Sequence, residues 1–424
     1  MICYYYPPLL DVGCKRSVAF SRYFEKYGWN PHVISVKNPD KAYCMIGNDT
    51  PPSGIQPDYT YSILNVYRFF GKLNGLLSKA LKLLGIDGKR NYFHELLCIP
   101  DIFFGWIPLT VVRAARIVKE RHIDTVYVSC SPFSAGVIGV LLKFLTKKPL
   151  IVDFRDIYAL EIKSLKNTRP RTAFRKRVDS RIEECILKWA DLFVVTTEEM
   201  NDAYGRIYGH LTGKIFTVHN GFESKNLPRN TVDAKFDKFT IIYAGNFYFE
   251  VPGAHLFFEA LASLQRKGKI DGTNFQFLYY GQCAADIDRL AADFQIKNLV
   301  HTTGSIPHSE LLRIIRRSHM QLLRIMKPMI STKLFEGIAL NIPLLAIIPS
   351  GEVEQIIKEY SPGSYVLSSA SSDAVGTAIR DAMRRYEKRE VQDNHIDEFL
   401  ANFSRENLTY RLMKIVEKNL HVLG

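Results

Sequence analysis

Short apolar segments alternate with helical patterns along the whole chain, and this alternation limits the possible folds more than any other feature. It is typical of βαβ units, in which helices connect parallel strands and cover the sheet. The predicted strands of the first half are Ile2–Tyr6, His32–Val36, Thr125–Ser129, Leu150–Phe154, Leu192–Thr196 and Ile215–Val218. Those of the second half are Phe239–Ala244, Phe275–Tyr280, Val300–Thr303, Met320–Leu323 and Leu344–Ile348. We therefore predict an α/β protein with two Rossmann-like, doubly wound domains.

The length of the chain agrees with two domains. A chain of 424 residues is too long for one ordinary core and suits two domains of roughly 200 residues each. The dipeptide Asn220-Gly221 is typical of a turn, so we expect the join there.

Positive charge is concentrated in the first half of the chain. Residues 1–220 contain 31 Lys and Arg against 20 Asp and Glu, a net charge of +11, whereas the whole chain carries +13. Such an excess favours an extended anionic partner: lipid headgroups, a polyphosphate or nucleic acid. We find no nucleic-acid-binding motif, and expect an anionic membrane surface instead.

One segment of the first half has the pattern of a membrane-surface helix. Leucines at helical spacing in Leu73–Leu84 form an apolar stripe, and Lys72, Lys79 and Lys82 lie on the other side. The alternative is an ordinary amphipathic helix that packs on the domain core.

Other features favour a cytoplasmic protein. No apolar run reaches the roughly 18 residues of a membrane span, and the N-terminal residues lack the basic and apolar regions of a secretory signal. The 7 cysteines are scattered, odd in number and form no CxxC pair, which favours reduced thiols over a zinc site. We expect the protein at the inner face of the cell membrane, with no cofactor and no metal.

The segment Ser331–Gly337 joins a polar turn to a short predicted helix. Lys333 and Glu336 are three residues apart and therefore share one helix face. A cation suits a diphosphate and a carboxylate suits a ribose diol, so this pair predicts a nucleotide-sugar site. The alternative is a surface ion pair.

Glycines and charged residues follow several predicted strands, where ligands bind in open α/β sheets. Gly13 precedes a predicted helix with Lys15 and Arg16 in its first turn, and Gly245 and Gly281 end strands of the second half. The segment Asp153–Asp156 closes a strand with three charges; its alternative interpretation is a local ion-pair cluster.

Four motifs resemble those of bacterial GT-B glycosyltransferases, most closely glycosyltransferase family four, the retaining enzymes that build cell-surface polysaccharides. The motifs are Asp153–Asp156, His219–Phe222, Ser331–Glu336 and Phe403–Glu406. The resemblance implies two Rossmann-like domains that face a central cleft. Residues 1–221 would bind the acceptor and residues 222–404 the nucleotide-sugar. Residues 405–424 would form a helix that crosses back to the first domain.

The resemblance also implies roles for individual residues. Glu336 would bind the ribose hydroxyls and Lys333 the diphosphate. The implied donor-binding set is Gly13, Gly245, Asn246, Gly281, Ile306, Ser331, Lys333 and Glu336. The catalytic candidates are Lys333, Arg155 and Asp156, and the acceptor-binding candidates are Lys15, Arg16 and Asp153. No metal would be needed, because lysine and helix dipoles neutralise the leaving diphosphate.

The sequence departs from the family pattern at two donor-site positions. Pro328 stands where many relatives have a glutamate eight residues before the ribose glutamate. Asn246–Phe249 stand where relatives often have an arginine and a lysine. These departures leave the donor sugar open.

The expected function is transfer of a sugar from a UDP- or GDP-sugar to a hydroxyl of a lipid-linked or glycan acceptor, with retention of configuration. Two alternatives remain open. One is a non-catalytic, glycosyltransferase-like binding subunit, which the Pro328 departure favours. The other is a GT-B sugar-nucleotide epimerase, which would need a cluster of acid and base groups beyond Asp153 and Asp156.

Overall fold

The computed structural model describes most of the chain. The described residues are 1–9, 12–40, 44, 46–47, 49–63, 75, 79, 98–160, 172–228, 234–249, 253–325, 329–369, 371–390 and 394–420. Two features of the sequence lie outside them: the predicted helix Leu73–Leu84, apart from Gly75 and Lys79, and Pro328.

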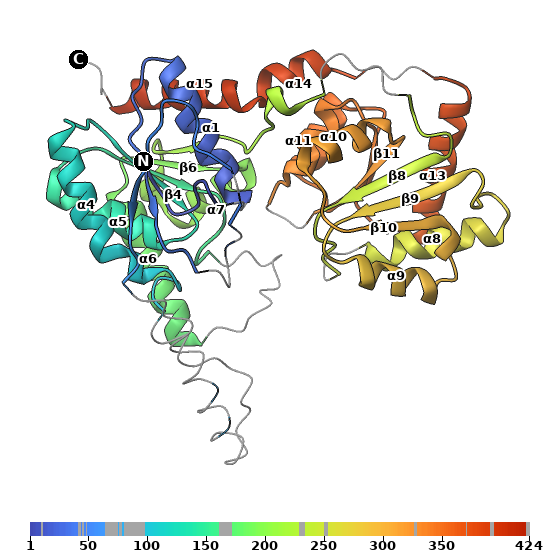
Figure 1. Cartoon of the computed structure of the whole chain (residues 1–424), viewed down its shortest axis with the longest axis horizontal. Coiled ribbons are helices and arrows are strands. Elements are labelled where there is room, and N and C mark those ends of the chain that lie inside the picture. Colours follow the sequence, from blue (N-terminus) through green and yellow to red (C-terminus); the bar gives the residue numbers. More distant parts are fainter. Residues whose placement is uncertain are drawn as a thin grey trace. The chain divides into compact units, whose positions relative to one another are not determined.

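The chain divides into two compact units (Figure 1). The first contains Met1–His219 together with residues from Leu408 onward, and the second is Asn220–Asn407. The break between His219 and Asn220 lies directly before the dipeptide Asn220-Gly221, in which Gly221 has a φ of +56°. The last helix, α15 (Arg405–Leu420), starts in the second unit, and its later turns belong to the first.

The first unit is built on a parallel sheet. Its strands are β1 (Ile2–Cys3), β2 (Ile34–Val36), β3 (Asp58–Thr60), β4 (Val126–Cys130), β5 (Leu150–Phe154), β6 (Leu192–Val195) and β7 (Ile215–Thr217). They pair in the order β3-β2-β1-β4-β5-β6-β7, the doubly wound order of a Rossmann-like domain. The helices are α1 (Val12–Lys26), α4 (Ile107–Glu120), α5 (Ser134–Thr146), α6 (Ala173–Trp189) and α7 (Glu198–Ile207).

Both faces of this sheet are covered. Along β6, Phe193 belongs to a core with α4 and α5, whereas Leu192 and Val194 belong to a core with α1 and α15. Successive side chains point to opposite faces of a strand, so a sheet covered on both sides needs a continuous apolar run. This is why the central strands of this sheet are recognisable in the sequence.

The second unit repeats the design with another parallel sheet. Its strands are β8 (Phe239–Ala244), β9 (Phe275–Tyr280), β10 (Val300–Thr303), β11 (Met320–Arg324), β12 (Leu344–Ile347) and β13 (Tyr365–Leu367), in the order β10-β9-β8-β11-β12-β13. Its helices are α8 (Ala254–Arg266), α9 (Ala284–Asp293), α10 (His308–Arg317), α11 (Thr332–Ala339), α12 (Glu352–Tyr360), α13 (Ser372–Glu387) and α14 (Ile396–Phe403). The predicted fold class, two Rossmann-like parallel-sheet domains, is confirmed.

The structure adds two strands that the sequence does not predict. β3 and β13 have three residues each and lie at an edge of their sheets. Among the helices that the structure describes, none combines the length and the hydropathy needed to cross a bilayer.

Candidate active site

The candidate donor site lies at the carboxyl edge of the second sheet. The strand order reverses its direction between β8 and β11, which are hydrogen-bonded neighbours. Such a switch point is where open α/β sheets bind their ligands. The chain leaves β8 through Gly245, whose φ of +95° suits glycine because this residue has no Cβ.

Lys333 lies directly against Gly245. A Cβ on Gly245 would be 3.3 Å from Cε and 3.5 Å from Nζ of Lys333. Nζ also donates a hydrogen bond of 3.0 Å to the Tyr243 hydroxyl and lies 4.2 Å from the centre of the Tyr243 ring. Ser331 precedes α11 and caps it, because its hydroxyl accepts a bond from the Lys333 backbone N–H. The cap fixes the first turn of α11 and with it the position of Lys333.

Glu336 follows one turn later on α11. Its Oε1 lies 3.0 Å from Nε2 of His308, the first residue of α10. Ile306 lies in the loop between β10 and α10, two residues before His308. The structure therefore brings Lys333 and Glu336 of α11 to the same sheet edge as the Ile306 loop, although the two segments are separate in the sequence.

Gly281 and Asn246 complete the surroundings of Gly245. A Cβ on Gly281 would be 2.5 Å from the Gly245 carbonyl oxygen, so Gly281 allows the two loops to pack closely. The Gly245 oxygen accepts a bond of 2.9 Å from the Tyr279 hydroxyl. Asn246 is exposed, and its carbonyl oxygen accepts from Tyr243 at 2.9 Å. Gly281 is buried, which favours a role in shaping the loop over contact with a phosphate.

The electrostatics of this edge suit an anion. Burial lowers the pKa of Lys333 to about 8; the positive charge of Arg324 lowers it further and the carboxylate of Glu336 opposes the shift. Burial also lowers the pKa of Arg324 to about 10. A negative ligand bound next to Lys333 and Arg324 would raise the pKa of both side chains and so favour their charged forms.

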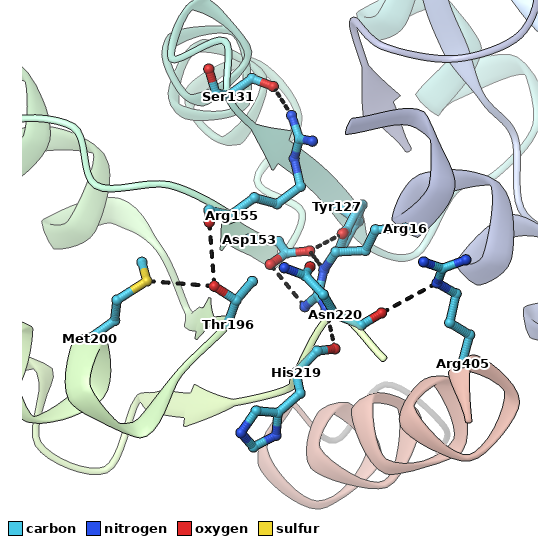
Figure 2. Close-up of polar contacts among 10 residues, drawn as sticks. All are labelled: Arg16, Tyr127, Ser131, Asp153, Arg155, Thr196, Met200, His219, Asn220 and Arg405. Carbon is cyan, nitrogen blue, oxygen red and sulfur yellow. Dashed lines mark hydrogen bonds and ion pairs between the residues drawn. The ribbon is translucent and has the colours of Figure 1, made fainter. Parts of the chain in front are cut away.

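Two charged candidates of the first unit, Arg16 and Asp153, form a buried ion pair (Figure 2). Arg16 Nε donates to Asp153 Oδ2 at 2.7 Å and its Nη2 to Oδ1 at 3.1 Å. The Tyr127 hydroxyl donates to the same carboxylate, and Arg16 Nη1 donates to the His219 carbonyl at 2.7 Å. Asp153 is 0% and Arg16 4% exposed. This geometry favours the ion-pair interpretation, in which both residues position α1 against β5, over direct contact with an acceptor.

Arg155 is only partly buried and remains a candidate for ligand contact. It follows β5, and its guanidinium donates to the Ser131 carbonyl (Figure 2). Its guanidinium carbon also lies 5.7 Å from the Tyr5 ring centre. A Cβ on Gly13 would lie 2.2 Å from Arg155 Nη1, so a larger residue at position 13 would clash with the guanidinium in this position. Asp156 is exposed and Lys15 partly buried at the same sheet edge.

No pattern in the sequence marks three residues of the donor edge as site residues: Tyr243, His308 and Arg324. Tyr243 and Arg324 stand near or at the ends of apolar strands and look like core or surface positions. Among the residues that the structure describes, no group of three His, Cys, Asp or Glu could hold a metal ion.

Two family models match the sequence. The model of Glycosyltransferase Family 4 matches residues 18–225, and that of Glycosyl transferases group 1 matches residues 226–398. The chain belongs to the family 4-like glycosyltransferases. This glycosyltransferase matches none of the curated proteins with which its sequence was compared.

Solved structures share the fold of the glycosyltransferase. Anabaena HepE in complex with UDP and glucose is 11% identical, with a TM-score of 0.62, and the match covers 95% of both chains. A glycosyltransferase from Rickettsia africae is 16% identical, with a TM-score of 0.61 and coverage of 97% and 96%. Sucrose-phosphate synthase of Thermosynechococcus elongatus is 13% identical, with a TM-score of 0.59 and coverage of 95% and 92%. These similarities place the glycosyltransferase in the GT-B fold class.

Proposed function

We propose that this glycosyltransferase moves a sugar, with retention of configuration, from a UDP- or GDP-sugar to a hydroxyl of a lipid-linked or glycan acceptor. The product would be a part of a bacterial surface polysaccharide. The observation that carries the proposal is the arrangement of Lys333 and Glu336, one turn apart on α11, beside Gly245 at the switch point of the second sheet.

In this proposal each group of the donor edge has one task. Lys333 binds the diphosphate, and Glu336, oriented by His308 at 3.0 Å, accepts hydrogen bonds from the ribose hydroxyls. The positive φ of Gly245 and its missing Cβ leave room for a phosphate beside Lys333. The complexes of HepE with UDP and with UDP-glucose support a uridine donor.

The reaction needs no nucleophile from the protein. The acceptor oxygen forms a bond to the anomeric carbon, the bond from that carbon to the phosphate oxygen breaks, and the acceptor proton passes to the departing diphosphate on the same face. Lys333 stabilises the negative charge of the leaving group, so the enzyme acts by positioning and charge stabilisation. Arg155 and Asp156, at the carboxyl edge of the first sheet, orient the acceptor.

The same charges argue for a reaction without a metal ion. Lys333 and the N-terminus of α11 supply positive potential to the diphosphate. We expect activity to survive EDTA; a strict requirement for a divalent cation in the chemical step would contradict this part of the proposal.

We also propose that the enzyme acts at the inner face of the cell membrane. The net charge of +11 in residues 1–220 supports attraction to anionic lipid. A lipid-linked acceptor would be presented at that surface.

The decisive experiment is a screen of nucleotide-sugars by mass spectrometry, with polyprenol-linked glycans as acceptors. We expect release of a nucleoside diphosphate and a product one sugar heavier. Lys333→Ala should lower nucleoside-diphosphate affinity about 10- to 150-fold, the effect of a lost charge-assisted hydrogen bond of roughly 1.5–3 kcal/mol. Glu336→Ala should weaken nucleotide binding and leave inorganic diphosphate binding unchanged.

The screen also separates the alternatives. A sugar-nucleotide epimerase would convert its donor to an isomer without any acceptor. A binding subunit would bind the nucleotide and leave every donor unchanged. If neither Lys333→Ala nor Glu336→Ala altered nucleotide affinity, the assignment of the donor site to the second unit would be wrong.

A further inference from the structure

Arg324 is a second buried cation at the donor edge of the second unit. It is the last residue of β11 and is 5% exposed. Its guanidinium carbon lies 4.3 Å from the centre of the Phe247 ring, and Nη2 donates a bond of 3.0 Å to the Tyr248 carbonyl oxygen. Arg324 therefore contacts the segment that follows Gly245.

An aromatic pair connects Arg324 with Lys333. The Phe247 and Tyr243 rings meet edge to face, with centres 4.8 Å apart. Lys333 Nζ lies 4.2 Å from the Tyr243 ring centre, as Arg324 lies near the ring of Phe247. The two cations thus contact the two members of one aromatic pair, and Gly245 lies between these two aromatic residues in the sequence.

Without a ligand, this arrangement of two cations is electrostatically unfavourable. Two like charges are held close together in a partly dehydrated place, and the charge of Arg324 is the second cause, after burial, of the lowered pKa of Lys333. An anion with charges on two neighbouring phosphates would offset the repulsion. The segment Asn246–Phe249 contains no basic residue, so the positive charge beside it comes from β11.

We propose that Arg324 is the second cation of the diphosphate site and acts together with Lys333 across the switch point between β8 and β11. This inference rests on the proposed function, because it assigns a further residue to the same site. Arg324 attracts the phosphates through its charge and holds the backbone of Tyr248 through its hydrogen bond. Because the pKa of Arg324 is about 10, the side chain stays charged at neutral pH.

The test compares the binding of UDP, uridine and inorganic diphosphate to the full-length protein by calorimetry. Arg324→Gln should lower the affinities for UDP and for inorganic diphosphate about 10- to 150-fold, while uridine affinity changes less than about twofold. The ratio of UDP to uridine affinity is the readout that a purely structural role would not move. In a double variant with Lys333→Gln, the two losses should be non-additive, because both residues act on the same group.

Arg317→Gln is the matched control. Arg317 also places its guanidinium carbon 4.3 Å from a phenyl ring, that of Phe236, but it stands at the other end of α10 from His308. We expect this variant to bind all three probes like the wild type. Arg324→Lys keeps the charge without the planar group and should retain most of the diphosphate affinity.

The outcomes separate this inference from the proposed function. Unchanged UDP and diphosphate affinities in Arg324→Gln would overturn the role of Arg324 and leave the function intact. Diphosphate binding that needs Arg324, in a protein that binds no nucleotide, would support the anion site and contradict the function. If Arg324→Gln does not fold, Arg324→Lys decides: an equal loss for uridine and UDP would mean that Arg324 is only structural and would overturn the inference.

Discussion

At the scale of single residues, the donor site depends on the protonation of Lys333. Its pKa of about 8 reflects burial and the charge of Arg324, opposed by Glu336. Tyr243, its hydrogen-bond partner, has a pKa raised to about 12 by burial and stays neutral. A diphosphate favours the charged lysine, so donor binding should take up a proton above pH 8.

Nucleotide affinity should therefore fall as the pH rises from about 8 to 9.5, by at most tenfold per pH unit. Folding stability has the opposite sign. Between pH 8 and 10.5 the unfolded chain holds a proton that the folded chain has lost, so the Lys333 contribution stabilises the protein as the pH rises. Calorimetry in buffers of different ionisation enthalpy measures the proton uptake. An affinity independent of pH, or the same profile in Lys333→Met, would be evidence against this assignment.

His308 offers a second residue-scale prediction. Its Nε2 lies 3.0 Å from Glu336 Oε1, so it should orient the ribose-binding carboxylate. His308→Ala should weaken uridine and UDP binding by about 2- to 10-fold, the value of a hydrogen bond of roughly 0.5–1.5 kcal/mol. His308→Gln, which can still donate, should recover part of the loss. Inorganic diphosphate serves as the control probe, since equal weakening of its binding would point to a general disturbance.

Contacts between residues that are far apart in the chain cannot be predicted from a local sequence pattern. The sequence places Asp153 at the end of a strand, and in the structure it is the penultimate residue of β5. Its partner Arg16 lies 137 positions away, so no local pattern indicates that the carboxylate is used inside the fold. Arg324 and His308 are missed for the same reason: their contacts come from other strands and helices.

At the scale of secondary-structure elements, predictability follows burial. β5, β8 and β9 have the predicted bounds, because central strands between two layers of helices need long apolar runs. β10 also has its predicted bounds, although it lies at an edge of its sheet and is only partly buried. β3 and β13 have three residues each at sheet edges, and β3 begins with Asp58. Such short segments lack the four to eight residues over which a strand pattern is recognisable.

Gly281 tests how closely the loops after β8 and β9 must pack. Its Cβ would lie 2.5 Å from the Gly245 carbonyl oxygen, a backbone atom that cannot move without the loop. Gly281→Ala should lower the free energy of unfolding by about 1–3 kcal/mol, as overpacking does, and weaken UDP binding. Gly304→Ala is the matched control, since nothing lies within 4 Å of its Cβ position. Thermal unfolding of both variants measures the difference; equal stabilities would mean that the loop adapts freely.

At the scale of the whole molecule, the uneven charge predicts binding to membranes. Each basic residue near an anionic surface contributes about 1 kcal/mol, and the attraction fades beyond a Debye length of roughly 8–10 Å. Binding to vesicles with anionic lipid should therefore weaken steeply as salt rises. Sedimentation with vesicles at increasing salt checks this, and undetectable binding at low salt would favour a soluble acceptor.

The helix predicted at Leu73–Leu84 is a separate part of this expectation. Replacing Leu77 and Leu81 together by Ser should reduce vesicle binding and leave UDP affinity unchanged. Leu109→Ser, at an exposed leucine on α4, is the control. If the Leu77 and Leu81 double variant unfolds and the wild type does not bind vesicles, this helix belongs to the core of the domain and not to a membrane surface.

Most of α15 belongs to the first unit, although it is synthesised after the second unit. Leu408, Leu412, Met413 and Val416 complete a core of the first unit with Phe20 and Phe24, yet the ribosome makes them only after the whole second unit. During translation, the apolar side chains of residues 1–219 that α15 covers therefore stay exposed until α15 has been synthesised. Such exposed apolar surface can bind chaperones and can cause aggregation. A nascent chain stalled at residue 219 should bind an apolar dye, and the complete chain should lose that binding. The core of the first unit is thus completed only after the second unit has been synthesised.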